Sequence, residues 1–319
     1  MPIDEAGLPA RLDAADGRPK DTTWGLFGPD DQLGTLNFLT DERVRDAAAL
    51  VRTGRRINLN LPLDEPFRDN QAGTRKAYEH HHTPTVAPSG AVDPTSTDEL
   101  LSNLNTQYST QWDGLGHVRH PRLGHYRGLS HEDVRPGPAG ALSIGAWARA
   151  GGIVARGVLI DLPTYAAATG LDYTPGQRLV VGPDLIEKIL AWQHTDIRAG
   201  DVLFLRTGSL PARRAGQDMA ACAGFGPGRE IGAFVWRHRV AAIASDSPST
   251  EASPIDPTGP RSVHMQLIPM MGMPIGELFD LEELAADCAA TGTYDFMLVS
   301  MPLNLPGGIA SPANAVAIR

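Results

Sequence analysis

Apolar residues recur along the chain in two patterns, solid runs and helical spacing, and the two patterns alternate. Solid runs predict strands that are covered on both faces, and they lie at residues 157–162, 201–206, 240–245 and 296–300. Helical spacing predicts helices between them, at residues 143–150, 183–194 and 229–238. The chain shows no internal repeat and no linker that would divide it. Alternating helices and strands therefore predict one α/β domain with a mixed or parallel sheet.

The N-terminal part divides into an arm and the start of this domain. Residues 1–30 are polar and rich in Gly, Pro and Asp, and predict an extended arm that becomes ordered where it docks. Thr40 is a helix cap, and the helix that follows it has a stop signal at Gly54 and a strand at residues 57–61 after it. We therefore expect an arm over residues 1–30 and the α/β domain over residues 31–319.

Two further segments carry local signals. Residues 64–106 are rich in Pro, Thr, Ser and Asp and are too long for an ordinary connection, which predicts either irregular hairpins or functional loops. We favour loops that wall a pocket. Near the C-terminus, Asp280 and Glu283 predict a capping-box variant that opens a helix.

Composition narrows the classes of function. Apolar residues make up 42% and charged residues 20% of the chain, and no apolar run approaches the roughly 20 residues that span a bilayer. The net charge of −9 argues against binding to nucleic acid or to an anionic membrane. The acidic N-terminus lacks the apolar segment of a secretory signal, so we expect a cytoplasmic protein. Cys222 and Cys288 are far apart and are expected to be buried, unpaired thiols.

The strongest chemical signal lies in residues 107–117, where Asp113 and His117 are four residues apart with Gly114 and Gly116 between them. A carboxylate is a hard oxygen ligand, and an imidazole is a ligand or a proton shuttle near neutral pH. The two glycines would let the backbone come close to an ion or a substrate. From the residues alone, the alternative is that Asp113 caps a turn and His117 is a structural hydrogen-bonding group.

This segment resembles the cyclase superfamily, which includes bacterial kynurenine formamidases and isatin hydrolase. The resemblance implies that Asp113 is a metal ligand and that His117 is the catalytic acid and base. It extends to residues 24–37, 197–208, 244–251, 263–281 and 301–312, and it implies a swivelling β/β/α cyclase-like fold. In the segment 263–281, His264 and Glu277 match ligands of a second metal ion; they are thirteen residues apart, so only the tertiary fold can join them.

The chain departs from the family pattern at Gln107 and Gln111, which stand where the family has two histidine ligands. An amide oxygen is neutral and is a weaker ligand than imidazole. Three interpretations follow. One divalent ion, zinc or manganese, binds to Asp113, His264 and Glu277, with Gln111 as a fourth ligand or as a substrate contact; or a harder ion tolerates the amides; or there is no metal, and His117 works with Asp113 alone. We also assign Gln107 and Trp24 to substrate binding, the latter because an N-terminal Trp contacts substrate in kynurenine formamidases, although Trp24 is equally a candidate packing anchor.

Other histidines offer rival sites. His80, His81 and His82 are consecutive, and in an extended segment neighbouring side chains point in opposite directions, so all three cannot bind one ion. His120 and His125 lie in an Arg-rich stretch that we interpret as an entrance for an anionic or carbonyl-rich substrate. Sequence signatures of dinucleotide binding, phosphoryl transfer, serine hydrolysis and thermolysin-like proteolysis are absent from the chain.

These observations lead to three hypotheses of function on a small-molecule substrate. The first is a hydrolase that opens a cyclic amide, a lactone or an N-acyl bond with a metal-activated water and His117 as general acid and base. The second is a cyclase, dehydratase or isomerase with little or no need for metal, in which His117 and Asp113 are acid and base. The third is a binding protein without catalysis. Relatives form dimers and tetramers, so we expect a homo-oligomer.

Overall fold

The computed structural model describes residues 5–12, 17–65, 75, 77–217, 219–255 and 262–319. Parts of the predicted N-terminal arm and of the segment 64–106 therefore lie outside the described residues. The α-helices are α1 (Asp41–Ala48), α2 (Ile144–Arg149), α3 (Leu162–Thr169), α4 (Pro183–Trp192), α5 (Ser209–Arg214), α6 (Gly228–Arg237), α7 (Val263–Met265) and α8 (Glu282–Thr291). Shorter turns are the 3-10 helices η1 (Glu5–Gly7), η2 (Gly34–Phe38) and η4 (Tyr126–Gly128), and η5 (Gln266–Met270) is a π-helix.

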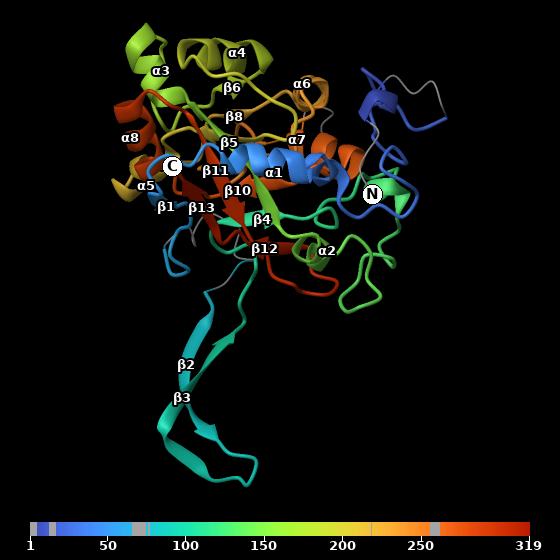
Figure 1. The fold of residues 1–319 in the computed structure, drawn as a ribbon, viewed down its shortest axis with the longest axis vertical. Coiled ribbons are helices and arrows are strands. Elements are labelled where there is room, and N and C mark those ends of the chain that lie inside the picture. Colours follow the sequence, from blue (N-terminus) through green and yellow to red (C-terminus); the bar gives the residue numbers. More distant parts are fainter. Residues whose placement is uncertain (1–4, 13–16, 66–74, 76, 218, 256–261) are drawn as a thin grey trace.

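A nine-stranded mixed sheet forms the centre of the molecule (Figure 1). Its strands, in spatial order, are β1 (Arg56–Asn58), β13 (Ala315–Ile318), β11 (Asp295–Ser300), β5 (Ile153–Asp161), β7 (Val202–Arg206), β9 (Ala242–Ser245), β10 (Ile275–Glu277), β4 (Gln111–Asp113) and β12 (Ala310–Pro312). From β5 to β10 neighbouring strands are parallel, and the outer pairs are antiparallel. The predicted α/β class with a mixed sheet is confirmed.

The central strands are buried because helices and loops cover both of their faces. All four residues of β9 are buried, as are four of the five residues of β7. Helix α1 packs against β5 and β11, and α4 packs against β5. These strands correspond to the predicted apolar runs, and the predicted helices at residues 41, 143, 183 and 229 are present as α1, α2, α4 and α6.

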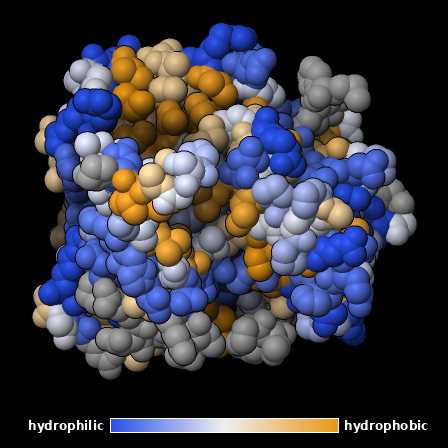
Figure 2. All heavy atoms as spheres, turned by 90° about the horizontal axis from the view of Figure 1, so that it is seen from below, coloured by the Kyte–Doolittle hydropathy of each residue, from blue (hydrophilic) through white to orange (hydrophobic). Residues whose placement is uncertain are grey.

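Residues 79–102 correct one prediction. Strands β2 (Glu79–Val86) and β3 (Val92–Ser102) form a separate two-stranded sheet, and this hairpin projects away from the body of the molecule (Figure 1). It does not wall a pocket there. The apolar residues that would have fastened such a loop to the body are instead exposed, namely Val86, Val92, Leu100 and Leu101. Seen along the hairpin axis, this side of the molecule carries hydrophobic patches scattered among hydrophilic residues (Figure 2).

Three smaller findings complete the fold. The predicted capping box is confirmed in part: the Glu282 amide at the start of α8 donates to Asp280 Oδ1 at 3.3 Å, but Glu283 pairs with Arg55. Both cysteines are buried and unpaired, as predicted. A further pair of short parallel strands, β6 (Val180–Val181) and β8 (Gly224–Phe225), lies outside the main sheet. In the described part of the chain, no helix has the length and apolar character needed to cross a membrane.

Candidate functional site

Alternate residues of strand β4 face the candidate site and the core. Gln111 and Asp113 lie on one face, while Trp112 between them is fully buried on the other. Strand β10 pairs with β4 so that Glu277 lies opposite Gln111. The neighbouring pair places Gly276 opposite Trp112, and a Cβ on Gly276 would come within 2.8 Å of the indole ring. Packing of that indole therefore fixes the register that brings Gln111, Asp113 and Glu277 together.

His264 reaches the same place from α7. Glu251 holds the start of this short helix, accepting hydrogen bonds from the Val263 amide (2.7 Å) and from the Ser262 hydroxyl (3.2 Å). The same carboxylate lies 2.6 Å from His264 Nδ1. A proton on Nδ1 directed at Glu251 leaves Nε2 facing the strands, which is the arrangement of carboxylate, histidine and metal found in many metal sites.

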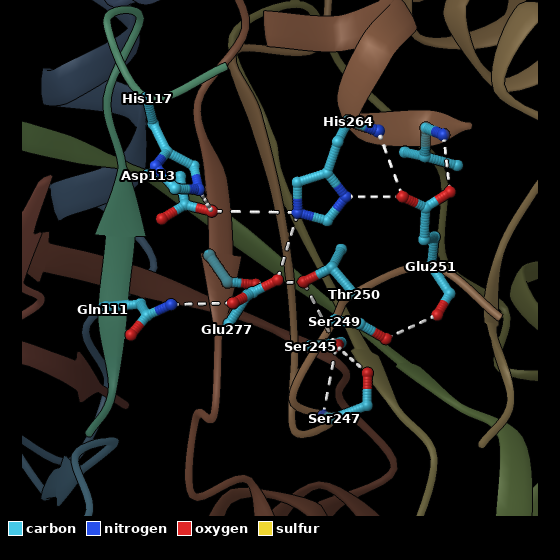
Figure 3. A network of polar contacts seen from close by, with 12 residues as sticks. Gln111, Asp113, His117, Ser245, Ser247, Ser249, Thr250, Glu251, His264 and Glu277 are labelled. Atoms are coloured by element: carbon cyan, nitrogen blue, oxygen red, sulfur yellow. Dashed lines mark hydrogen bonds and ion pairs between the residues drawn. The ribbon is translucent and has the colours of Figure 1, made fainter. Parts of the chain in front are cut away.

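Three side chains converge at the centre of the site (Figure 3). His264 Nε2 is 3.2 Å from Glu277 Oε1 and 3.8 Å from Asp113 Oδ2. One ligand atom from each of Asp113, His264 and Glu277 lies within 4.8 Å of the other two. His264 and Glu277 are thirteen residues apart in the sequence, and the tertiary fold brings them together, as predicted.

The two glutamines occupy the remaining carboxylate oxygens. Gln107 Nε2 donates to Asp113 Oδ1 at 2.5 Å, and Gln111 Nε2 donates to Glu277 Oε2 at 2.7 Å. Asp113 Oδ2 is buried and has no hydrogen-bond partner, and the same holds for Gln111 Oε1. Each amide therefore takes one oxygen of a carboxylate and leaves the other directed at His264.

His117 stands at the open side of the site. Its Nε2 is 3.6 Å from Asp113 Oδ2, and its side chain is 26% exposed, whereas Asp113 is 1% exposed. Gln107 Nε2 is 3.3 Å from the ring nitrogens. The imidazole can thus contact a substrate while Asp113 stays buried behind it.

The acidic groups and the histidines shift one another's pKa. Burial lowers the pKa of His264, but hydrogen bonds and charge from Glu251 and Glu277 outweigh burial and raise it to about 10. Burial and the charge of Asp113 raise the pKa of Glu277 to about 6. Burial lowers the pKa of His117, an effect that Asp113 opposes and that His264 and Arg75 reinforce. The carboxylates around His264 therefore favour a positive charge between them, whereas His117 is neutral near neutral pH.

Residues of this site that the sequence analysis did not single out are Glu251 and Arg75. Glu251 orients His264, and the Arg75 guanidinium donates to the Gln107 backbone carbonyl at 2.7 Å. Glu251 has no recognisable sequence signal, because its role depends on where α7 begins. Arg75 is followed by Lys76 in the Pro- and Thr-rich stretch, and nothing in the sequence distinguishes it as a site residue.

Gly114 and Gly116 have a packing role that the sequence did not reveal. A Cβ on Gly114 would come within 2.7 Å of the Ile309 carbonyl oxygen, and one on Gly116 within 2.7 Å of Val134. These glycines make room for the C-terminal segment and for Val134. That their backbone comes close to an ion or a substrate stays a prediction.

Trp24 and the Arg-rich stretch are engaged in packing. The Trp24 indole donates to the Pro269 carbonyl at 2.8 Å, which ties the N-terminal segment to η5; its role in substrate binding stays a prediction. His125 is buried. The Arg127 guanidinium donates to the Asp31 carbonyl at 2.7 Å. Because both side chains face other parts of the protein, they do not form the predicted entrance.

Comparison with known proteins identifies the family of the chain. Residues 43–252 match the model of the family described as "Putative cyclase". A solved structure described as a novel cyclase is 30% identical, with a TM-score of 0.77, over 94% of this chain and 100% of that one. None of the curated proteins that were compared matches the sequence significantly.

Two isatin hydrolases share the fold at lower identity. Isatin hydrolase A from Labrenzia aggregata, bound to benzyl benzoate, is 16% identical with a TM-score of 0.56, over 85% of this chain and 94% of that one. An isatin hydrolase bound to the product analogue thioisatinate is 18% identical with a TM-score of 0.52, over 85% and 93% of the two chains. The family model and the 30% identical structure together show that this chain belongs to the cyclase family.

Proposed function

We propose that the protein is a hydrolase that opens a small cyclic amide, a lactone or an N-acyl bond. The observation that carries the proposal is Asp113 Oδ2, a buried carboxylate oxygen without a hydrogen-bond partner, which faces His264 Nε2 together with Glu277 Oε1. A buried carboxylate oxygen without a partner is costly, and a cation bound between the two carboxylates removes that cost. Isatin-type lactams and N-formyl arylamines belong in the first substrate screen, because isatin hydrolases share the fold and the family resemblance extends to kynurenine formamidases.

The residues present fit one divalent ion. Asp113, His264 and Glu277 would hold it; Gln111 could be a fourth ligand only by giving up the hydrogen bond that its amide donates to Glu277. One imidazole and two carboxylates suit Zn²⁺ or Mn²⁺. Such an ion supplies Lewis-acid polarisation of a carbonyl and lowers the pKa of a coordinated water. The two glutamine amides already satisfy the second oxygen of each carboxylate, which supports a site for one ion.

His117 is the group that moves protons. Burial keeps it neutral near neutral pH, so it can accept a proton from the attacking water and return it to the leaving nitrogen or oxygen. Asp113, 3.6 Å away, stabilises the imidazolium that forms in between. Gln107 donates to Asp113 and contacts the His117 ring, and so holds both in position.

The test measures bound metal and turnover in tag-free protein. Metal is counted in a parent that carries His80→Ala and His82→Ala, which removes the hairpin histidines as ligands. We expect about one ion per chain in this parent, loss of the ion on adding Asp113→Ala or His264→Ala, and loss of turnover with the ion retained on adding His117→Ala. His131→Ala is the control: its ring is exposed and stacks on His125, so metal and activity should both be kept. Full activity in His117→Ala would overturn the proposed role of this residue.

The second candidate is a metal-independent cyclase, dehydratase or isomerase that uses His117 and Asp113 as acid and base. The observation in its favour is that amides stand at residues 107 and 111 and that a protonated His264 can itself balance the two carboxylates. Activity that survives exhaustive chelation, in protein that does not rebind Mn²⁺ or Zn²⁺, would favour it over hydrolysis. The homo-oligomeric state and the cytoplasmic location stay predictions.

A further inference from the structure

The projecting hairpin gathers three ligand-type side chains on one of its faces. His80 and His82 are two residues apart on β2, so they point to the same side of the ribbon. Register places His82 opposite Glu99 of β3, on that same side. His81 points to the other side, opposite Leu100. Because adjacent strand residues point in opposite directions, His81 cannot share an ion with His80 and His82, which lie on one side of the ribbon.

Distances within this group suit a single transition-metal ion. His80 Nε2 is 2.6 Å and His82 Nε2 is 3.6 Å from Glu99 Oε1, and a ligand atom from each residue lies within 4.8 Å of the other two. Tetrahedral zinc with bonds of about 2.1 Å holds its ligand atoms roughly 3.3 Å apart. Shifts of about 1 Å would therefore complete the site. All three side chains are exposed and free to make them.

Charge on the hairpin favours a cation. Between residues 77 and 104 the sequence has four carboxylates and neither Lys nor Arg. Imidazole ligands select zinc, copper and nickel over calcium and magnesium. A two-stranded ribbon is at best marginally stable alone in water, and β2 and β3 pair only with each other in the described sheets. An ion bound by both strands would tie them together.

We propose that the hairpin binds Zn²⁺ through His80, His82 and Glu99, with the fourth position open to water, and that the ion stiffens the hairpin. This site is separate from the one formed by Asp113, His264 and Glu277. It does not depend on the function proposed above.

Zinc titration calorimetry on the tag-free, full-length chain tests the proposal, with His264→Ala as the parent so that the body site is removed. The parent should bind one zinc ion. Adding His80→Ala or His82→Ala should weaken that binding by on the order of tenfold or more, because each change removes a ligand. The matched control is His81→Ala, a histidine of the same strand on the opposite face, which should bind zinc like the parent. Equal binding with and without His82, or no zinc bound by the parent, would overturn the proposal.

A second measurement does not depend on folding of the His264→Ala parent. In the otherwise wild-type chain, zinc should slow amide hydrogen exchange across residues 79–86 and 92–102. The same slowing is expected in His81→Ala and not in His80→Ala or His82→Ala. Unchanged exchange in the wild type at saturating zinc would contradict the stiffening, whatever the stoichiometry.

Discussion

At the scale of single residues, the two glutamines explain how this site differs from the family pattern. An amide nitrogen cannot bind a metal, but it can donate to a carboxylate. Gln107 and Gln111 use this property on Asp113 and Glu277, one oxygen each. With glutamine in place of histidine, these two residues act as donors to Asp113 and Glu277, the carboxylates proposed to bind the single ion.

A buried ion pair outside the site yields a prediction about pH. Arg156 is buried among Asp201 (3.1 Å), Asp295 (2.9 Å) and Asp196 (3.0 Å). Burial raises the pKa of Asp201 to about 7 against the pull of Arg156. Its value in the unfolded chain is about 3.9. Between these values the folded state holds a proton that the unfolded state has lost, so this residue's contribution to stability falls as the pH rises toward 7.

Asp201→Asn should remove this dependence. At pH 5 the wild-type side chain is protonated and resembles Asn, whereas at pH 8 it is a buried anion. The free energy of unfolding of the variant relative to wild type, measured by urea denaturation, should therefore increase from pH 5 to pH 8. A relative decrease would mean that Arg156 dominates over burial and that the pKa of Asp201 is lowered.

Four residues of the candidate site were predicted individually from the sequence. Asp113, His117, His264 and Glu277 were each identified by family resemblance, and the fold places them together; their catalytic and metal-binding roles stay predictions. Glu251 was not identified, because its function is to hold His264 and its position follows from tertiary packing. Sequence indicated residue types but not which oxygen of a carboxylate is free.

At the scale of secondary structure, the sequence predicted the longer elements with a buried face and missed strands that are very short or exposed. The apolar runs of β5, β7, β9 and β11 stood out. Strands β4 and β10 have three residues each, which is too short for a period. The hairpin strand β2 is almost wholly exposed, so no alternation of apolar and polar residues marks it.

One contact between elements predicts a large loss of stability. Gly34 of η2 has a φ of +57°, and a Cβ there would overlap the carbonyl oxygen of Gly272. That carbonyl accepts the Thr35 amide at 2.9 Å. Gly34→Ala should lower the free energy of unfolding by more than about 3 kcal/mol, since both the backbone and its neighbour would have to move. Gly54, with φ of +71° and no atom within 4 Å of an added Cβ, is the control.

Gly54→Ala should cost only about 1 kcal/mol, the strain of the left-handed conformation. Urea denaturation of the two variants beside the wild type measures the difference. Equal losses would show that η2 and the loop at Gly272 separate without penalty, and that their contact does not position the N-terminal segment.

At the scale of the whole molecule, the candidate site belongs to the central sheet, and the hairpin projects away from it. Strands β4 and β10 of the sheet hold the carboxylates of the site, and the hairpin between β1 and β4 leaves the body (Figure 1). The hairpin enters and leaves next to Arg75 and Gln107, which contact each other. Changes in the hairpin can therefore reach the site through this contact at its base.

The buried carboxylates around His264 also lower the free energy of unfolding of the metal-free protein. Burial and, after it, the charge of Asp113 raise the pKa of Glu277, so these two buried carboxylates oppose each other's ionisation. Asp113→Asn should therefore make the metal-free protein about 1 kcal/mol more stable and inactive. Urea denaturation in a chelator measures the gain, with Asp172→Asn, a change at an exposed residue, as the neutral control.

Saturating Mn²⁺ should reverse the order, because the ion binds the folded wild type and not the variant. A variant less stable than wild type in the chelator would show that the acids are not in conflict. If the order does reverse, selection for thermal tolerance alone would drive this chain toward inactive sequences, and the presence of Asp113 today records selection for chemistry.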